Sequence, residues 1–350
     1  MRWRHDTALL LAATLSLVGC ASQGLITAEP GPVWPPAPAA PRIAHQLVID
    51  DAGQLHRPSL LGRIGTMITG ERPHALREPV AVAVASDRVL MIADQKRQGV
   101  HVIDLASGRA RFVGHVDGTF LVSPVGVAVC GSLLAIADSA LGEVYLVTPE
   151  GRFVRRLEPD DGFGRPTGLA YCTQRALLFV ADTTAHRVHV FRLDGQLVQT
   201  IGGPGHEPGE FNFPTHLAID AERRLYVTDS LNFRVQALDE RGRYLFELGR
   251  HGDATGHFGV PKGVAVDSHG HIYVADSYFC TVQVFDDRGR LLLSLGEPGD
   301  ARGQFAVPGG LAVDAEGRIY VADAHNHRVQ ILRYVGDDPD AQAQASTTSR

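Results

Sequence analysis

The sequence predicts an all-β fold, a closed six-bladed β-propeller. The prediction rests on a repeated strand-loop-strand pattern, its nearly fixed period and the absence of a helical period between the copies. Each copy is an apolar run that ends in Asp, a short loop, and a second run in which apolar and polar residues alternate. The Asp residues are separated by 44, 44, 47, 47 and 47 residues: Asp94, Asp138, Asp182, Asp229, Asp276 and Asp323. A period in this range is typical of a repeat architecture.

Each complete repeat contains four short predicted strands. In the fourth copy they cover residues 214–220, 225–229, 234–239 and 244–249, with Gly, Asp or Asn in the turns between them. Four antiparallel strands in roughly 45 residues form a propeller blade rather than a βαβ unit. Six such units predict six blades.

The last repeat lacks its fourth strand, because the apolar pattern ends at residues 329–334. A closed ring therefore needs a strand from the N-terminal side. Residues 43–49 and residues 60–65 are both candidates. The second segment also carries apolar residues at helical spacing, so we favour 43–49 as the closing strand and 59–69 as a short packed helix. The propeller domain is then predicted to span 43–335.

The N-terminus carries the pattern of an export signal. Arg2 and Arg4 precede an apolar run at residues 9–18, so residues 1–19 are predicted to be a signal peptide. Leu17-Val18-Gly19-Cys20 looks like a bacterial lipobox, which predicts lipidation of Cys20 and a membrane anchor. The alternative is an ordinary secretory signal with an incidental cysteine.

The remaining termini are predicted to lie outside the propeller. Residues 20–42 are rich in proline and are expected to form an extended stalk, and residues 336–350 are polar and are expected to be a disordered tail. Ser22 suggests the outer membrane, by resemblance to bacterial sorting rules. The net charge of -6 provides no basic field of the kind that nucleic-acid binding needs.

The repeats resemble a known family. Gly209-Glu-Phe211-Asn-Phe-Pro214, followed by Asp229 and Arg234, resembles the NHL repeat, and the two later copies reproduce it. The likeness covers roughly residues 75–335 and is weaker in the first two copies. The whole chain also resembles NHL-type six-bladed lipoproteins of Gram-negative bacteria. That resemblance implies a role in an envelope or exopolysaccharide system.

The predicted topology places the loops after the six Asp residues on the same face as the long connections before each blade. Nine of the sixteen histidines map to this face: His74, His115, His186, His206, His216, His251, His257, His325 and His327. The position two residues after each blade proline is predicted to face the central channel, and His216 is the only histidine there, where four other repeats carry Gly126, Gly168, Gly263 and Gly310. Since one histidine cannot supply the three protein ligands of a catalytic zinc, we predict neither a metal nor a cofactor in the channel. The candidate binding residues are His216, Lys262, Tyr278, Thr215 and His325.

Two cysteines occupy equivalent positions in neighbouring blades. Cys130 and Cys172 each lie six residues after a blade proline, and an exported protein can form disulfides. A disulfide between them is possible. The alternative is two buried thiols whose Cα atoms lie beyond bridging distance.

No nucleophile triad, P-loop or dinucleotide motif stands out from the repeat. The predicted function is therefore a non-enzymatic binding scaffold, lipid-anchored at the outer membrane, for an envelope protein or polysaccharide. The alternative is a secreted lyase or lactonase with a metal-assisted site at the channel mouth, near His216, Lys262 and Tyr278.

Overall fold

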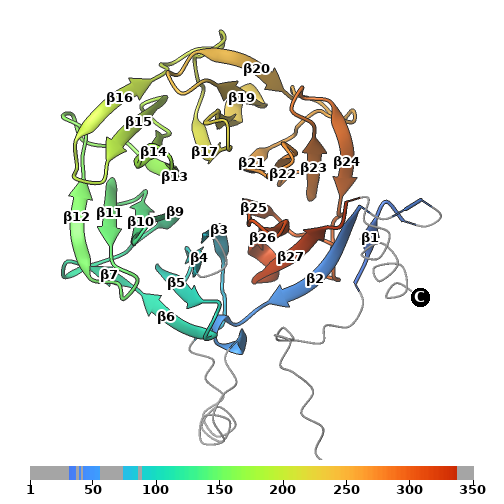
Figure 1. The fold of residues 1–350 in the computed structure, drawn as a ribbon, viewed down its shortest axis with the longest axis horizontal. Coiled ribbons are helices and arrows are strands. Elements are labelled where there is room, and N and C mark those ends of the chain that lie inside the picture. Colours follow the sequence, from blue (N-terminus) through green and yellow to red (C-terminus); the bar gives the residue numbers. More distant parts are fainter. Residues whose placement is uncertain (1–30, 37–38, 41, 56–73, 86–88, 337–350) are drawn as a thin grey trace, which may run out of the picture.

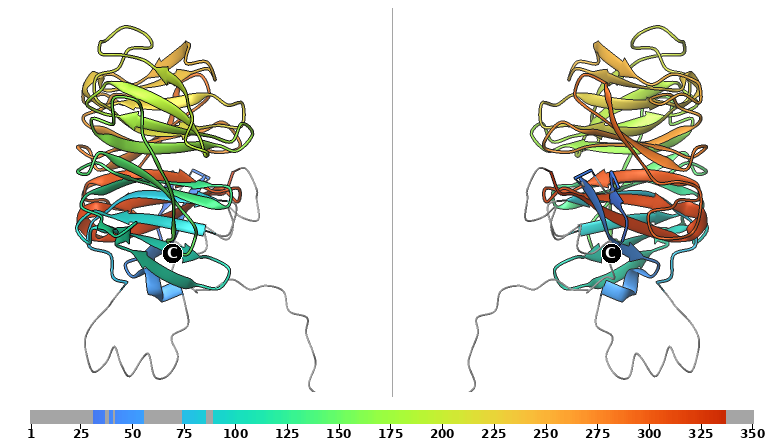
Figure 2. Two further views of the ribbon diagram at one scale, coloured as in Figure 1. Left: turned by 90° about the vertical axis from the view of Figure 1, so that its left-hand side faces the viewer. Right: turned by 90° about the vertical axis from the view of Figure 1, so that its right-hand side faces the viewer.

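The computed structural model describes residues 31–36, 39–40, 42–55, 74–85 and 89–336. Six antiparallel sheets lie around a central axis, as Figure 1 shows, and edge-on views show the ring as a thick disc (Figure 2). Five sheets have four strands and the sixth has five. The predicted all-β, six-bladed propeller is confirmed.

The strands follow one another outward from the axis in each of blades 1 to 5. Blade 1 contains β3 (Pro79–Ala85), β4 (Val89–Asp94), β5 (Gly99–Asp104) and β6 (Arg109–Val113). Blade 2 contains β9 (Pro124–Cys130), β10 (Leu133–Asp138), β11 (Glu143–Val147) and β12 (Phe153–Leu157). Blade 3 contains β13 (Pro166–Cys172), β14 (Leu177–Asp182), β15 (Arg187–Arg192) and β16 (Leu197–Ile201). Blade 4 contains β17 (Pro214–Ile219), β18 (Leu225–Asp229), β19 (Arg234–Leu238) and β20 (Tyr244–Leu248). Blade 5 contains β21 (Pro261–Val266), β22 (Ile272–Asp276), β23 (Thr281–Phe285) and β24 (Leu291–Leu295).

Blade 6 is assembled from both ends of the chain. Its inner strands are β25 (Pro308–Val313), β26 (Arg318–Asp323) and β27 (Arg328–Tyr334), and β2 (Ile43–Ile49) pairs with β27 from Ile43↔Tyr334 to Ile49↔Val329. The predicted closing strand at 43–49 is therefore confirmed. The helix predicted at 59–69 lies outside the described residues.

A fifth strand corrects the predicted stalk. β1 (Val33–Trp34) pairs with Ile43 and Ala44 at the outer edge of blade 6, so residues 33–34 belong to the propeller and not to a free stalk. A Cβ atom added to Gly303 would lie 2.4 Å from Pro32 and 2.8 Å from Trp34, which shows how closely this segment packs. The other connecting elements are short: η1 (Ala52–Leu55), η2 (Ser230–Asn232), η3 (Ala324–Asn326), and a small hairpin of β7 (His115–Val116) and β8 (Thr119–Phe120).

The core lies between neighbouring blades, in six hydrophobic clusters. In the last three NHL-like copies the repeat phenylalanine, such as Phe258, is completely buried. Its ring lies against a glycine with positive φ: a Cβ atom at Gly249 would be 2.1 Å from the Phe258 ring. In these repeats the Phe ring therefore occupies the space that a side chain at the glycine would need.

The six repeat aspartates are completely buried and tie each blade's second strand to the entrance of its first strand. Asp94 accepts hydrogen bonds from the backbone N–H groups of Arg77 (2.7 Å) and Glu78 (3.0 Å), which precede the blade proline. It also accepts from Arg97 in its own loop, at 3.1 Å. These bonds fix the loops that surround the channel mouth.

The closing strand contains a buried histidine. Neither ring nitrogen of His45 has a hydrogen-bond partner within the described part of the chain, and its side chain lies near the positive charges of Arg302 and Arg328. The neighbouring Gln330 amide is already bonded to Gly303, Gln304 and Asp323. Burial, with these two cations, lowers the pKa of His45 to about 4.

We expect acid to weaken the closed ring through His45. The folded-state pKa of about 4 lies below the ordinary value of 6.5, so the unfolded chain binds more protons between these values. The free energy of unfolding then has its full value above about pH 6.5. It falls as the pH drops toward 4, by up to roughly 3 kcal/mol. Urea unfolding between pH 4 and 7 should show a smaller loss of stability for His45→Leu. An identical pH dependence in that variant would contradict this assignment.

Candidate binding site at the channel mouth

One hydrogen bond repeats in all six blades and builds one face of the ring. The residue after each repeat aspartate donates its backbone N–H to the carbonyl of the residue before the blade proline. In blade 1, Gln95 donates to Glu78 at 3.0 Å, and in blade 3, Thr183 donates to Arg165 at 2.9 Å. The predicted placement of the Asp loops beside the long connections is therefore confirmed.

A cavity of about 390 Å³ lies at the centre of this face. Its volume is in the range of roughly 300–1,000 Å³ that is usual for small-molecule sites. The residue directly after the blade proline lines it in every blade: Val80, Val125, Thr167, Thr215, Lys262 and Gly309. We call this cavity the channel-mouth pocket. At the other end of the axis, the inner strands surround a smaller cavity of about 180 Å³.

The position two residues after the proline does not generally face the pocket, which corrects the prediction. A Cβ atom at Gly126 would lie 1.8 Å from the carbonyl oxygen of Thr167 in the next blade, and one at Gly168 would lie 2.4 Å from that of Thr215. These glycines allow neighbouring inner strands to approach closely. His216 is the exception, because it lines the pocket.

His216 is enclosed by the ring while keeping part of its surface toward the pocket. Burial, followed by the charge of Lys262, lowers its pKa to about 3. Its imidazole is therefore neutral at physiological pH. The Nδ1 atom lies 3.1 Å from the Thr215 hydroxyl, which in turn lies 2.6 Å from the Ser230 hydroxyl.

Among the six lining residues that directly follow the blade prolines, Lys262 is the one with a charged side chain. Burial and the nearby Arg165 lower the pKa of its ammonium group, so a negatively charged ligand group would relieve an unfavourable environment. The hydroxyls of Thr167 and Thr183 are 2.8 Å apart and offer neutral hydrogen-bonding groups nearby. Val80 and Val125 supply apolar surface.

Four of the five predicted binding residues line the pocket together: His216, Lys262, Thr215 and His325. Tyr278 is not among the lining residues. Its side chain is 71% exposed and its ring packs against Phe279. The sequence analysis missed Arg165 and Thr167. The repeat could have identified Thr167 had the position after each proline been compared across blades.

The pocket does not bring metal ligands together. His216, His325 and Glu78 are its only lining residues with imidazole or carboxylate groups. In the parts of the chain that the structure describes, they do not form a group of three with ligand atoms close enough to share an ion.

The possible disulfide is not formed, because Cys130 and Cys172 are both free thiols. Cys130 packs in the hydrophobic cluster between blades 2 and 3, whereas Cys172 packs in the cluster between blades 3 and 4. Equivalent positions in neighbouring blades thus enter different interblade spaces. Burial raises the pKa of the Cys130 thiol to about 12, which makes it unreactive at neutral pH.

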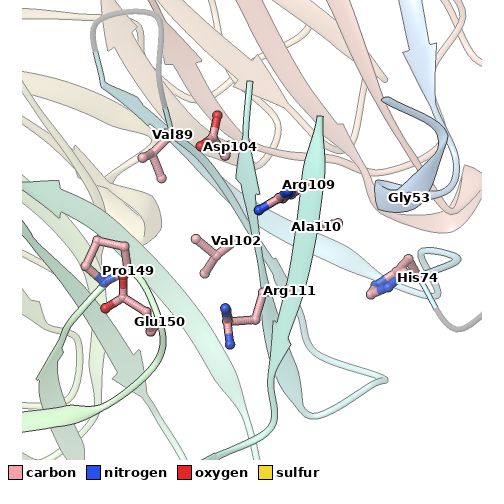
Figure 3. A pocket seen from close by; sticks show the side chains of 10 residues that line it. All are labelled: Gly53, His74, Val89, Val102, Asp104, Arg109, Ala110, Arg111, Pro149 and Glu150. Carbon is pink, nitrogen blue, oxygen red and sulfur yellow. The ribbon is translucent and has the colours of Figure 1, made fainter. Parts of the chain in front are cut away.

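A larger cavity of about 710 Å³ lies on the outer side of blade 1 (Figure 3). Arg109 and Arg111 line it, together with Asp104 and Glu150. Its charges are mixed and its walls come from the blade rim, so they do not converge as those of the channel-mouth pocket do. We therefore regard the channel-mouth pocket as the candidate site.

Comparison with known families agrees with the repeat and with the ring. The NHL repeat model matches residues 258–285 and 305–332, and a model described as a 6-bladed beta-propeller matches residues 168–235. The chain is a six-bladed propeller that contains NHL repeats in its last two blades. No curated protein sequence matches it significantly.

Solved structures similar to this NHL propeller share its fold at low sequence identity. A Bacteroides thetaiotaomicron protein of unknown function has 15% identity and a TM-score of 0.58, with 75% of this chain and 71% of that chain covered. An auxiliary nutrient binding protein from the same organism has 13% identity and a TM-score of 0.57, with 74% and 69% covered. Virginiamycin B lyase from Staphylococcus aureus has 12% identity and a TM-score of 0.54, with 74% and 95% covered.

Proposed function

We propose that this NHL propeller is a binding protein of the bacterial envelope, exported and anchored at the outer membrane through a lipid on Cys20. Its channel-mouth pocket would bind an acidic group of an envelope polysaccharide. The proposal is based on the lining of this pocket, where a partly desolvated ammonium group, hydroxyls and apolar side chains converge on one cavity. The anchor follows from the lipobox-like sequence at the N-terminus.

The pocket lining matches the chemistry of a charged sugar. Lys262 and Arg165 offer partners for a carboxylate or another acidic substituent. Thr167 and Thr215 can exchange hydrogen bonds with sugar hydroxyls, and Val125 can pack against the apolar face of a ring. An envelope protein would have to insert an acidic side chain to use the same groups, and the test below distinguishes the two partners.

The fold leaves binding and catalysis open, because its structural neighbours include both a nutrient binding protein and a lyase. The site supports binding more strongly. His216 is held neutral, but the described residues around it include no set of three metal ligands, and Tyr278 lies outside the pocket. We therefore favour a binding protein over a secreted lyase or lactonase.

Lys262→Gln is expected to weaken binding of an acidic oligosaccharide about tenfold or more, because it removes a charge-assisted hydrogen bond. The measurement is calorimetric titration of the purified propeller with oligomers of a uronic acid and with neutral glucan oligomers. Lys96→Gln is the matched control, since Lys96 is the only other lysine of the chain and is exposed on the same face. Binding should also weaken with rising salt.

Pull-down from solubilised membranes supplies the other arm of this experiment. The wild type should retain acidic polysaccharide and lose it after polysaccharide lyase treatment, and a Cys20→Ser form should leave the membrane fraction. Retention of a protein alone would favour the protein partner. Equal binding by wild type and Lys262→Gln would exclude the pocket as the binding site.

A further inference from the structure

A group of potential metal ligands lies on the face opposite the channel-mouth pocket. The turn between β21 and β22 carries Asp267, His269 and His271, and one ligand atom of each lies within 4.8 Å of the others. The Asp267 Oδ2 atom is 2.8 Å from Nδ1 of His271 and 3.9 Å from Nδ1 of His269. Within the described residues this is the group of three that satisfies such a distance criterion.

The same turn in the neighbouring blades shows that these histidines are a departure from the repeat. In blade 4, Arg224 donates through Nε to Asp220 at 2.6 Å, and in blade 6, Arg318 donates to Asp314 at 2.5 Å. His271 takes the place of these arginines. His269 takes the place of the glutamates, Glu222 and Glu316, that pair with the same arginines. Blade 5 thus replaces a permanent cation with two groups that can coordinate metal.

The distances suit a divalent transition metal ion. Zinc binds imidazole nitrogen and carboxylate oxygen at about 2.0–2.2 Å in tetrahedral geometry, so two ligands of one ion lie roughly 3.3 Å apart. The two distances to Asp267, 2.8 and 3.9 Å, lie on either side of this value. Shifts of about half an ångström would bring the two distances to Asp267 to this value, with a fourth position left for water.

The surrounding contacts orient the ligands. Asp267 Oδ1 accepts the backbone N–H groups of His269 and His271, each at 2.9 Å, and Oδ2 accepts the hydroxyl of Tyr273 at 2.9 Å. Both imidazole rings pack against Tyr334, with centroids 5.2 and 4.8 Å away. Hydrogen bonds of this kind hold a ligand side chain in a fixed position.

We propose that Asp267, His269 and His271 form a binding site for a divalent transition metal ion such as zinc. The site lies on the opposite face and is separate from the channel-mouth pocket. Tyr334 ends β27 and pairs with Ile43 of the closing strand. An ion bound here therefore orders the turn that packs against the end of the seam, and binding to the folded state raises the unfolding temperature.

The test is titration of the tag-free, metal-stripped propeller with Zn²⁺, followed by calorimetry and thermal unfolding. We expect one ion per chain and a rise in the unfolding midpoint of about 2 °C or more at saturation. His269→Ala should weaken binding at least tenfold, and because this side chain is 59% exposed, the variant should remain folded. His251→Ala, which changes an exposed histidine outside the channel-mouth pocket, should bind zinc as the wild type does.

His271→Arg provides the sharper control, because it restores the arginine that blades 4 and 6 carry at this position. This variant should keep or exceed the metal-free stability of the wild type and should lose the zinc-dependent rise. Absence of saturable binding to the wild type would overturn the proposal. Equal zinc binding by the wild type, His269→Ala and His271→Arg would overturn it as well.

Discussion

Removal of residues 1–50 is expected to abolish the folded propeller. The deletion takes away β2, whose Ile43 and Ile49 are 1% and 0% exposed, and it leaves the whole of β27 as an open edge. Loss of two buried isoleucines alone costs roughly 4–10 kcal/mol, which is comparable with the total stability of about 5–15 kcal/mol of a typical domain. Circular dichroism and size-exclusion chromatography should show unfolded or aggregated protein.

Deletion of residues 1–30 is the matched control. It retains β1, β2 and all the described contacts of blade 6, so its unfolding midpoint should equal that of the longer chain. A folded monomer lacking residues 1–50 would show that the ring does not depend on the N-terminal strand.

Asp323→Ala is expected to destabilise the propeller by about 3–5 kcal/mol. The Asp323 carboxylate is fully buried and accepts hydrogen bonds from Arg328 at 2.7 Å, Asn326 at 2.9 Å and the Ala306 backbone at 2.7 Å. Removal of the carboxylate leaves the nearly buried guanidinium of Arg328 without its counter-ion. Urea unfolding at pH 7 measures the loss.

Glu316→Ala serves as the control in the same blade. It breaks an ion pair with Arg318 of similar length, 3.0 Å, but at the exposed surface. Such pairs contribute less than about 1 kcal/mol. Equal destabilisation by the two substitutions would show that burial does not set the cost of losing the carboxylate.

The strands, their order and the seam followed from the sequence because each repeat carries its own turn and packing signals. Asp229 and Arg234 form a buried pair 2.9 Å long in blade 4, and their equivalents Asp323 and Arg328 form one of 2.7 Å in blade 6. The closing strand could be inferred because the last repeat was one strand short. The turn and packing signals within each repeat were therefore sufficient to predict the fold.

The direction of side chains at the axis could not be derived from strand alternation. The pairing shifts register just after the blade proline, as between Pro214 and Leu217, and such an irregularity changes which side chains face which side. The residue after the proline consequently lines the pocket, and the next one meets the neighbouring blade. The alternation of apolar and polar residues does not reveal this shift, because the shift lies in the pairing of the first two strands of a blade.

The placement of Trp34 was also beyond the sequence analysis. It lies among prolines that indicate an extended segment, whereas in the structure its strand pairs with Ile43 and Ala44 and its indole packs closely against Gly303. The metal-ligand turn was missed for a related reason. His269 and His271 are unremarkable until the same turn is compared with blades 4 and 6.

The seam between β2 and β27 also constrains how the protein is made. The first of these strands is synthesised near the start of the chain and its partner near the end, because Ile43 pairs with Tyr334. A ribosome must therefore finish almost the entire polypeptide before the circle can be completed, and contacts so distant along the chain form slowly. The ring consequently stays open for longer than a fold in which neighbouring segments of the chain pair first.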